Sequence, residues 1–552
     1  MSYMSILSVS KKLLSRTKKR KDERKITLRP FALSPFRPFA SSPPTLRLIF
    51  LCMILAVWLI GCNDINNFSQ NPNQLLAFST DTLSFDTVFT TIGTSTGFFM
   101  IYNRNNEALK IETIHLAGHE RSGFRINIDG RKGDTFNDIP IWKKDSLYVA
   151  VEVTVNPNEE NSPFFIYDSV VFITNGRTQY VLLEAYGQNV HILKGGVVFS
   201  SDTTLTAERP YLVYDSIRIP EGVTVQIAKG ASFYMHKDAK WLIDGTIITS
   251  GTQEEPVLFR ADRLNKLTPY LSYDNISAQW DGLYFSASSF NNELSYTLIR
   301  NGISGLTFEA STPDRKKIDI RNSQINNMDG NVLWAANCHI EASNTEFSNA
   351  TNYLVMLSGG KYRFTHCTMA NYMQRAMMSH KTPRYIQALT LSDHIVYIQE
   401  NGEEETQTFP LLQAYFDNCI IDGNLEGNIP IVDKGEILFS TDETFVNGDD
   451  IQYNYRFNHC VIRAKKVDNE RFNEVLFIVE PKTENTKYVK SIPENEDDDF
   501  DFIYDFRLAN ESLGIGKADR SIAAQFPTDR YGINRLTSEF GPSIGAYEYV
   551  EE

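Results

Sequence analysis

Four short segments that end in asparagine recur at nearly constant intervals, and they constrain the fold more than any other feature of the sequence. They are LIRN, QINN, EFSN and TMAN, which end at Asn301, Asn327, Asn349 and Asn371 and are therefore 26, 22 and 22 residues apart. One turn of a β-solenoid takes roughly 20–25 residues, so each interval predicts one coil. Asparagine tolerates left-handed backbone angles, and its amide can hydrogen-bond to the asparagine above it. We therefore expect these side chains to form a structural ladder at one corner of the coils.

A second register of the same repeat carries cysteine. The segments HCTM, NCII and HCVI align Cys367, Cys419 and Cys460, which predicts a ladder of thiols pointing into successive coils. A metal site built from these thiols with His366 or His459 is the alternative. Neighbouring residues of a strand face opposite sides, and the close cysteine pairs typical of zinc sites are missing from the sequence. We therefore expect buried structural thiols, with no metal and no cofactor.

Two earlier segments support the repeat by resemblance. LIDGTIITSGTQEEPVLF (residues 242–259) and WDGLYF (residues 280–285) resemble the opening coils of right-handed parallel β-helices. The resemblance implies a β-helix over residues 195–505. Residues 372–414 and 424–454 interrupt the repeat and are predicted to be surface insertions, where solenoids usually carry their binding function. The candidate binding residues are the aromatic residues of the first insertion: Tyr372, Tyr385, Tyr397 and Phe409.

Residues 83–190 show a different pattern, in which six short segments alternate apolar and polar residues between turn clusters. This pattern predicts a β-sandwich. The order of the phrases IYNRNNEALKI, VEVTVNPN and DSVVFITNG followed by YVLLEAYGQ resembles the abnormal-spindle and hydin type of immunoglobulin-like domain. The resemblance implies a spacer or docking module. His115 and His119 have no partner cysteine or paired carboxylate in the sequence, and we expect them to be turn or surface residues.

Three phrases stand out near the C-terminal end: LANESLGIGKA, DRYGINR (residues 529–535) and PSIGAYE (residues 542–548). Together they resemble a module known as choice-of-anchor Q, found after β-helix repeats in bacterial surface proteins, with Ser543 where that module has aspartate. The resemblance implies that residues 506–552 form a capping segment. Such a segment can cover the unpaired strand edge at the end of a solenoid. We expect Arg535 to pair with Glu548 across it.

The N-terminal sequence has the features of a targeting signal rather than of a folded domain. The apolar run at residues 48–61 is 14 residues long, shorter than the roughly 20 residues of a membrane-spanning helix. Leu59, Ile60, Gly61 and Cys62 resemble the lipobox of bacterial lipoproteins, in which the cysteine is acylated. The resemblance implies that residues 1–61 are a signal peptide, that Cys62 is the lipidation site and that residues 62–82 are a linker. The expected location is the outer membrane of a Gram-negative bacterium. The sequence is compatible with attachment to either the periplasmic or the surface-exposed face.

Charge excludes one class of partner. The whole chain has a net charge of −14, and residues 1–47 contain 12 Lys or Arg and 2 acidic residues. Removal of the leader therefore takes the net charge to −24. A chain this acidic is a poor nucleic-acid binder. The acidic tract PENEDDDFD (residues 493–501) lacks the spaced ligands of a calcium loop, so a solvated loop is favoured over a calcium site.

Two functions remain open. Parallel β-helices include polysaccharide lyases and glycoside hydrolases, which need convergent carboxylates or a calcium cluster with a base. The sequence offers Asp319 with Arg321 on one strand and Asp417 beside Asn418, without a repeated Asp pair. We therefore expect an all-β, lipid-anchored, cell-envelope protein that presents a non-catalytic β-helix to a glycan or a protein partner. A carbohydrate-active enzyme on the same anchor is the alternative.

Overall fold

The computed structural model describes residues 67–94, 96–118, 122–267, 271–373, 386–399, 402–425, 435–441, 452–479, 485–491, 495–496, 499–500 and 502–551. Cys62, His119 and Tyr385 lie outside the described residues. Among the residues that are described, none of the helices is long and apolar enough to cross a membrane.

The N-terminal part is a sandwich of two five-stranded sheets around one apolar core. The first sheet, in spatial order, consists of β1 (Ala77–Phe78), β3 (Gly97–Tyr102), β8 (Ser146–Val153), β5 (Phe124–Ile128) and β6 (Arg131–Gly133). The second consists of β2 (Thr82–Phe89), β10 (Arg177–Gln188), β9 (Phe164–Thr174), β4 (Leu109–Leu116) and β7 (Thr135–Ile141). The six segments predicted from alternation correspond to β3, β4, β5, β8, β9 and β10, so the predicted sandwich is confirmed.

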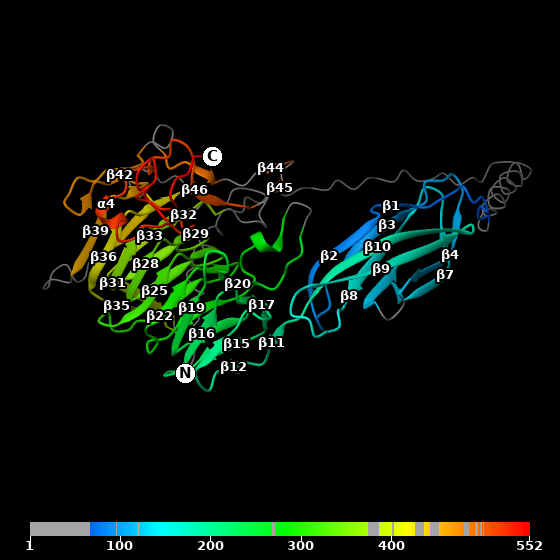
Figure 1. Ribbon diagram of the computed structural model, residues 1–552, viewed down its shortest axis with the longest axis horizontal. Coiled ribbons are helices and arrows are strands. Elements are labelled where there is room, and N and C mark those ends of the chain that lie inside the picture. Colours follow the sequence, from blue (N-terminus) through cyan, green and yellow to red (C-terminus); the bar gives the residue numbers. More distant parts are fainter. Residues whose placement is uncertain are drawn as a thin grey trace, which may run out of the picture.

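The rest of the chain is dominated by a right-handed parallel β-helix, which confirms the predicted fold class. The chain visits three long parallel sheets in rotation, with one strand of each in most coils. We name them the β11, β12 and β13 sheets after their first strands. Figure 1 shows the coils stacked beside the sandwich. The two parts are in contact near the first coils, where the rings of Phe89 and Tyr234 lie 4.8 Å apart.

The strand bounds follow the rotation. The β11 sheet contains β11 (His191–Leu193), β14 (Tyr211–Val213), β17 (Ser232–Met235), β20 (Val257–Ala261), β23 (Thr297–Arg300), β26 (Gln324–Met328), β29 (Glu346–Ala350), β32 (Thr368–Asn371), β37 (Ile420–Gly423), β40 (Val461–Ile462) and β42 (Leu476–Phe477). The β12 sheet contains β12 (Val197–Val198), β15 (Ser216–Ile219), β18 (Lys240–Ile243), β21 (Gly282–Phe285), β24 (Leu306–Phe308), β27 (Leu333–Ala336), β30 (Val355–Ser358), β33 (Leu389–Ser392) and β38 (Ile437–Ser440). The β13 sheet contains β13 (Thr203–Leu205), β16 (Thr224–Ala228), β19 (Thr246–Ser250), β22 (Asn292–Ser295), β25 (Lys316–Arg321), β28 (His339–Ser343), β31 (Gly360–Thr365), β36 (Leu411–Asp417), β39 (Tyr453–Asn458) and β41 (Phe472–Asn473).

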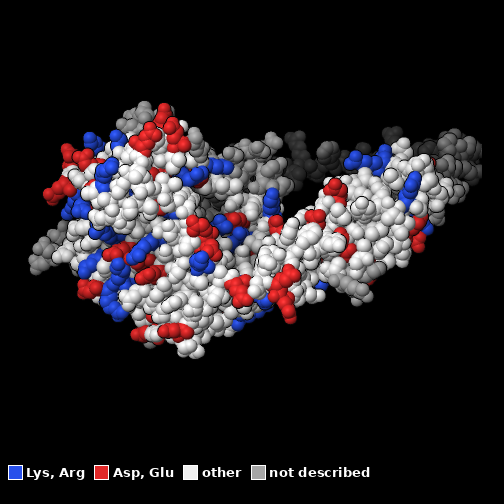
Figure 2. All heavy atoms as spheres, viewed as in Figure 1, with Lys and Arg blue, Asp and Glu red and all other residues white. Residues whose placement is uncertain are grey.

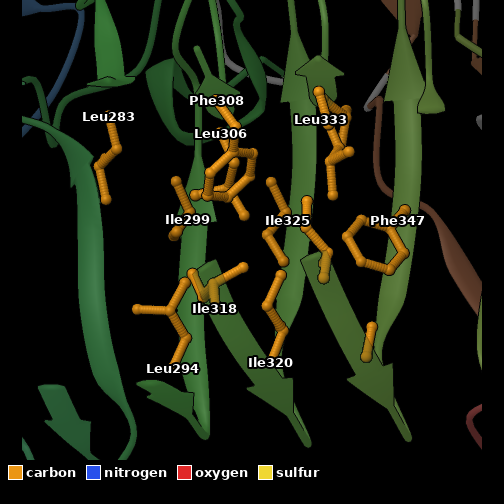
Figure 3. Close-up of a cluster of buried hydrophobic side chains, with 14 of the residues drawn as sticks. Leu283, Leu294, Ile299, Leu306, Phe308, Ile318, Ile320, Ile325, Leu333 and Phe347 are labelled. Carbon is orange, nitrogen blue, oxygen red and sulfur yellow. The ribbon is translucent and has the colours of Figure 1, made fainter. Parts of the chain in front are cut away.

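Side chains that point inward from all three sheets fill one continuous apolar interior. Figure 3 shows leucine, isoleucine and phenylalanine side chains facing one another inside the coils. Equivalent positions stack: the ring of Phe416 lies 5.2 Å from that of Phe364 and 4.9 Å from that of Phe457, with interplanar angles of 8° and 12°. Each coil therefore buries its apolar residues only because another coil lies above it, as expected for a repeat architecture.

The four asparagines of the sequence repeat occupy equivalent positions at the corner between the β11 and β12 sheets. Asn301, Asn327 and Asn349 have left-handed φ angles of 71°, 56° and 56°, and the register of β29 with β32 places Asn371 beside Asn349. The amides of Asn349 and Asn371 bond to the main chain of the neighbouring coil. The N–H of Tyr372 donates to Asn349 Oδ1 (3.0 Å), and Asn371 Nδ2 donates to the carbonyl of Ala350 (3.0 Å).

A second ladder, which the sequence alignment did not single out, lies at the corner between the β13 and β11 sheets. Its members have φ between 43° and 55°: Tyr296, Asn322, Asn344, His366, Asn418 and His459. Here side chains bond directly from coil to coil, since Asn344 Nδ2 donates to Asn322 Oδ1 (3.2 Å) and Asn418 Nδ2 lies 3.0 Å from His366 Nε2. The sequence signal is an Asn or His followed by a small inward residue, as in Asn344–Thr345 and His366–Cys367.

The prediction that residues 372–414 and 424–454 are surface insertions outside the coils is wrong. Residues 372–414 contain β33 and residues 424–454 contain β38, and both strands belong to the β12 sheet. The alignment recognised only two strands per coil, so the third strand was counted as insertion. The first range also holds an antiparallel hairpin of β34 (His394–Ile398) and β35 (Glu404–Thr408).

The C-terminal segment runs along the flank of the coils. After β43 (Tyr488–Lys490) pairs with β46 (Asp505–Leu508), the chain passes through the short helix α4 (Arg520–Ala523) and continues as residues 524–549. We call residues 509–549 the C-terminal strap. Its contacts reach four coils, at Asn344, Thr368, Asn418 and Asn458. A cap over the open end of the last coil was expected, and the observed contacts extend instead along the side of the solenoid.

The expected pair of Arg535 and Glu548 is present and closes the strap onto the solenoid. Arg535 Nη1 lies 3.4 Å from Glu548 Oε2, and neither side chain is exposed (0% each). Arg535 Nη2 also donates to Asn344 Oδ1 on the second ladder (3.1 Å). Glu548 accepts from the N–H and the hydroxyl of Ser543 at 2.9 and 2.7 Å. Serine suits this position because an aspartate there would bury a second carboxylate against Glu548.

Candidate functional site

The outward face of the β13 sheet carries a row of charged side chains joined by ion pairs. In-register pairing aligns the central outward residues of successive strands in one column: Glu293 on β22, Asp319 on β25, Glu341 on β28, Arg363 on β31, Tyr415 on β36 and Arg456 on β39. We call this column, with the charged residues that flank it, the charged face. Figure 2 shows blue and red side chains interleaved over this part of the β-helix.

In the lower half of the column, on β22, β25 and β28, two of the three carboxylates are held by cations: those of Asp319 and Glu341. Arg321 binds Asp319 with two hydrogen bonds, from Nε to Oδ1 (2.9 Å) and from Nη2 to Oδ2 (2.6 Å). Lys316 bridges Asp319 and Glu341, and His339 Nε2 lies 3.4 Å from Glu341 Oε1. Hydrogen bonding and charge attraction to Asp319 raise the pKa of Arg321, as expected for a cation beside a carboxylate.

The upper half is cationic and rests on a buried carboxylate. Asp417, whose side chain is fully buried, accepts from Arg363 Nη2 through Oδ2 (3.3 Å) and from Arg456 Nη2 through Oδ1 (3.1 Å). Arg456 also lies over the ring of Tyr415, with its guanidinium carbon 4.6 Å from the ring centroid. Asp417 thus holds two half-exposed arginines on the same face, and the trio carries one net positive charge.

The predicted binding aromatics do not form one surface. Tyr372 is buried against β43 and β46, where its ring contacts those of Tyr488 and Phe506. Its hydroxyl donates to Asp422 Oδ2 (3.0 Å). Burial raises its pKa well above the ordinary value. Tyr397 is exposed on β34, and Phe409 follows β35 at the foot of the hairpin, with its N–H bonded to the carbonyl of Asp393. The structure thus brings together neither Tyr372 with Tyr397 nor either of them with the charged face.

The three cysteines of the predicted thiol ladder lie in the interior at equivalent positions of successive coils. The N–H of Cys367 donates to the sulfur of Cys419 (3.5 Å), and burial raises the pKa of the Cys419 thiol well above its ordinary value. His366 bonds to Asn418 on the second ladder rather than turning inward with Cys367. Among the described residues, no group of three or more His, Cys, Asp or Glu side chains is placed to hold a metal ion.

The charged face was missed at the sequence level for a physical reason. Asp319, Arg321 and Asp417 were singled out, but the column depends on exact register between strands that are 22 to 52 residues apart in the chain. Residue spacing alone does not give that register when coils differ in length. A usable signal would have been the alternation of charged and apolar residues within each strand, as in KKIDIR and GKYRFT.

Comparisons with known proteins give weak structural likenesses. No family model matches the sequence, and no curated protein matches it. The catalytic domain of a GH87 alpha-1,3-glucanase aligns with 69% of this chain and 87% of its own at 10% identity and a TM-score of 0.17. A family 123 glycoside hydrolase from Clostridium perfringens aligns with 21% of this chain and 26% of its own at 8% identity and a TM-score of 0.16. The ASH/PapD-like domain of human CEP192 aligns with 23% of this chain and 94% of its own at 10% identity and a TM-score of 0.15. Likeness at this level carries no argument about function.

Proposed function

We propose that this chain is a lipid-anchored protein of the bacterial outer membrane that presents a non-catalytic β-helix to a glycan or protein partner. Cys62 is the proposed acylated residue, and the sandwich is the spacer between the anchor and the β-helix. The charged face of the β13 sheet is the proposed binding surface. In a solenoid the interior is committed to packing, so binding falls to ordered side chains on an outer face.

The observation that carries the proposal is the state of the carboxylates on the charged face. Both oxygens of Asp319 are bound by Arg321, and Oδ2 also accepts from Lys316. Both oxygens of Asp417 are bound by arginines. A glycosidase needs one carboxyl group free to give a proton to the leaving oxygen. Carboxylates engaged in this way are better suited to position cations for binding than to transfer protons.

One observation favours the alternative, a carbohydrate-active enzyme. Glu293, Asp319 and Glu341 stand side by side on adjacent strands, and neighbouring strands lie about 4.8 Å apart. The two carboxyl groups of retaining glycosidases are separated by about 5 Å. Hydrolysis would require Asp319 to release Arg321 when substrate binds.

The test is a paired measurement of binding and cleavage. The purified protein is incubated with neutral, uronic-acid and sulfated polysaccharides, and both capture and the release of unsaturated or reducing ends are followed. We expect capture without cleavage. Cleavage that disappears in Asp319→Asn, with the circular dichroism spectrum unchanged, would establish the enzyme instead. Absence of both capture and cleavage across the panel leaves a protein partner as the ligand and contradicts glycan binding.

A further inference from the structure

The upper half of the charged face differs in sign from the chain that carries it. The whole chain has a net charge of −14, yet the central column here presents Arg363 and Arg456, with Tyr415 between them on the intervening strand. Because adjacent strands lie about 4.8 Å apart, the backbones of the two arginines are about 10 Å apart. Both side chains nevertheless lean to the same carboxylate, that of Asp417.

A buried carboxylate determines the geometry of this cluster. The side chain of Asp417 is fully buried, whereas those of Arg363 and Arg456 are 45% and 43% exposed. Each arginine uses one Nη2 atom on Asp417. A guanidinium has five N–H donors in a rigid fork, so donors remain on both groups for an external acceptor. The ring of Tyr415 further restrains Arg456 by lying beneath its guanidinium.

An exposed arginine on a long flexible side chain loses conformational freedom when it binds. The buried carboxylate reduces that loss, because both guanidiniums are already oriented in the free protein. The trio retains one unit of positive charge, which favours an anion over a neutral hydroxyl. Planar guanidinium groups match carboxylate and sulfate oxygens with paired hydrogen bonds.

We propose that Arg363 and Arg456, positioned by Asp417, bind the carboxylate or sulfate groups of an acidic polysaccharide. The inference rests on the proposed glycan-binding function and names the ligand class. The linear column favours a polymer lying along the coil axis. The acidic half of the column, at Glu341, Asp319 and Glu293, repels anionic groups and so sets which end of the face they occupy.

The experiment compares the wild type with one variant of this cluster and one control variant elsewhere on the β-helix. Removing the arginines alone would strand Asp417 as a buried unpaired charge, which destabilises folds. The test variant is therefore Arg363→Gln/Asp417→Asn/Arg456→Gln, which removes all three charges together. The matched control is Arg218→Gln. Arg218 lies on β15 of the β12 sheet, its side chain is 44% exposed, and it is also ion-paired, with Asp244. Circular dichroism and thermal unfolding verify that each variant is folded.

The probes are polygalacturonate, dextran sulfate, neutral dextran and single-stranded DNA, each tested by affinity electrophoresis and calorimetry. We expect Kd for polygalacturonate or dextran sulfate to rise about tenfold or more in the triple variant and to stay unchanged in Arg218→Gln. The preferred polymer of the two distinguishes a carboxylate from a sulfate ligand. Single-stranded DNA bound equally well, and lost in the same variant, would show a general polyanion site and overturn the assignment.

The remaining outcomes separate this inference from the proposed function. Capture of dextran alone would leave glycan binding in place and overturn the anionic site. Capture of an acidic polymer that persists in the folded triple variant would place the ligand elsewhere on the chain. Failure of the wild-type protein to bind any of the polysaccharides would overturn both.

Discussion

Replacement of Arg535 by alanine should release the C-terminal strap from the flank of the β-helix. The fully buried Arg535 donates to the carbonyls of Ser543 (3.2 Å) and Gly545 (3.1 Å) and to the side chains of Asn344 (3.1 Å) and Glu548 (3.4 Å). The substitution removes all four interactions and leaves Glu548 buried without its cation. Breaking a buried ion pair from one side costs about 3–5 kcal/mol.

The cost should be local, because the three sheets bury their own core without the strap. Hydrogen exchange followed by mass spectrometry should show loss of protection in peptides covering residues 524–549, with the coils remaining protected. This readout is preferable to a single melting temperature, since a chain with two domains need not unfold in one step. Limited proteolysis should cleave the variant first within the strap.

The matched control is Arg507→Ala. Arg507 pairs with Asp505 on β46, just before the strap, but its side chain is 45% exposed, and exposed pairs contribute at most about 1 kcal/mol. It should leave exchange in residues 524–549 unchanged. Equal protection of the strap in Arg535→Ala and in the wild type would refute the reasoning, as would loss of protection throughout the coils.

Three further predictions follow from the ladders and from the N-terminus. Asn349→Leu should lower the free energy of unfolding by roughly 1–3 kcal/mol, because it places a branched side chain at φ 56° and removes the acceptor of the Tyr372 N–H. Asn349→Gly tolerates this backbone angle and should therefore lower the free energy of unfolding by less. An equal loss in both variants would show that backbone strain is not the cause. Burial and the neighbouring Arg535 hold the pKa of His366 well below its ordinary value of 6.5. Below pH 6.5 the unfolded chain therefore binds a proton at this histidine that the folded chain does not. The free energy of unfolding should fall as pH drops below 6.5, by up to about 1.4 kcal/mol per pH unit. His366→Asn, matching Asn344 and Asn418 of the same ladder, should flatten this slope in denaturant titrations, and an unchanged slope would assign the pH dependence to other groups. Cys62→Ser should abolish metabolic labelling with a palmitate analogue, whereas continued labelling would remove Cys62 as the lipidation site.

The repeat could be predicted from the sequence because coil length is a local property of the chain. The intervals between Asn301, Asn327, Asn349 and Asn371 reflect coil length directly, and left-handed turns select asparagine whatever surrounds them. The aligned cysteines were predictable for the same reason, since small inward residues recur beside the corner. Strand alternation was enough to find most of the sandwich.

The features that were missed depend on register between distant segments. β33 and β38 were taken for insertions because each is separated from the next recognisable strand by a long stretch, although both complete a coil. The C-terminal strap contacts residues that are distant in the chain, as in the hydrogen bond from Tyr547 to Glu346, 201 positions away. Tyr372 looked like an exposed aromatic at the start of a loop, yet residues of β43 and β46 bury it.

The charged face illustrates the same limit. KKIDIR, HIEAS and GKYRFT each read as an ordinary strand with one polar face. Their outward residues acquire meaning only when in-register pairing places Asp319, Glu341 and Arg363 next to one another. Ion pairs such as that of Arg456 with Asp417 then span strands whose separation in sequence is set by irregular loops.

The measurement that tests the central claim most directly is the simultaneous titration of polysaccharide capture and bond cleavage by the wild-type protein. Binding of an acidic polysaccharide without release of unsaturated or reducing ends is the result predicted for a non-catalytic β-helix. On its charged face Asp319, Glu341 and Asp417 are paired with Lys316, Arg321, Arg363 and Arg456. Catalytic release of such ends, abolished by Asp319→Asn while the fold is retained, would contradict it.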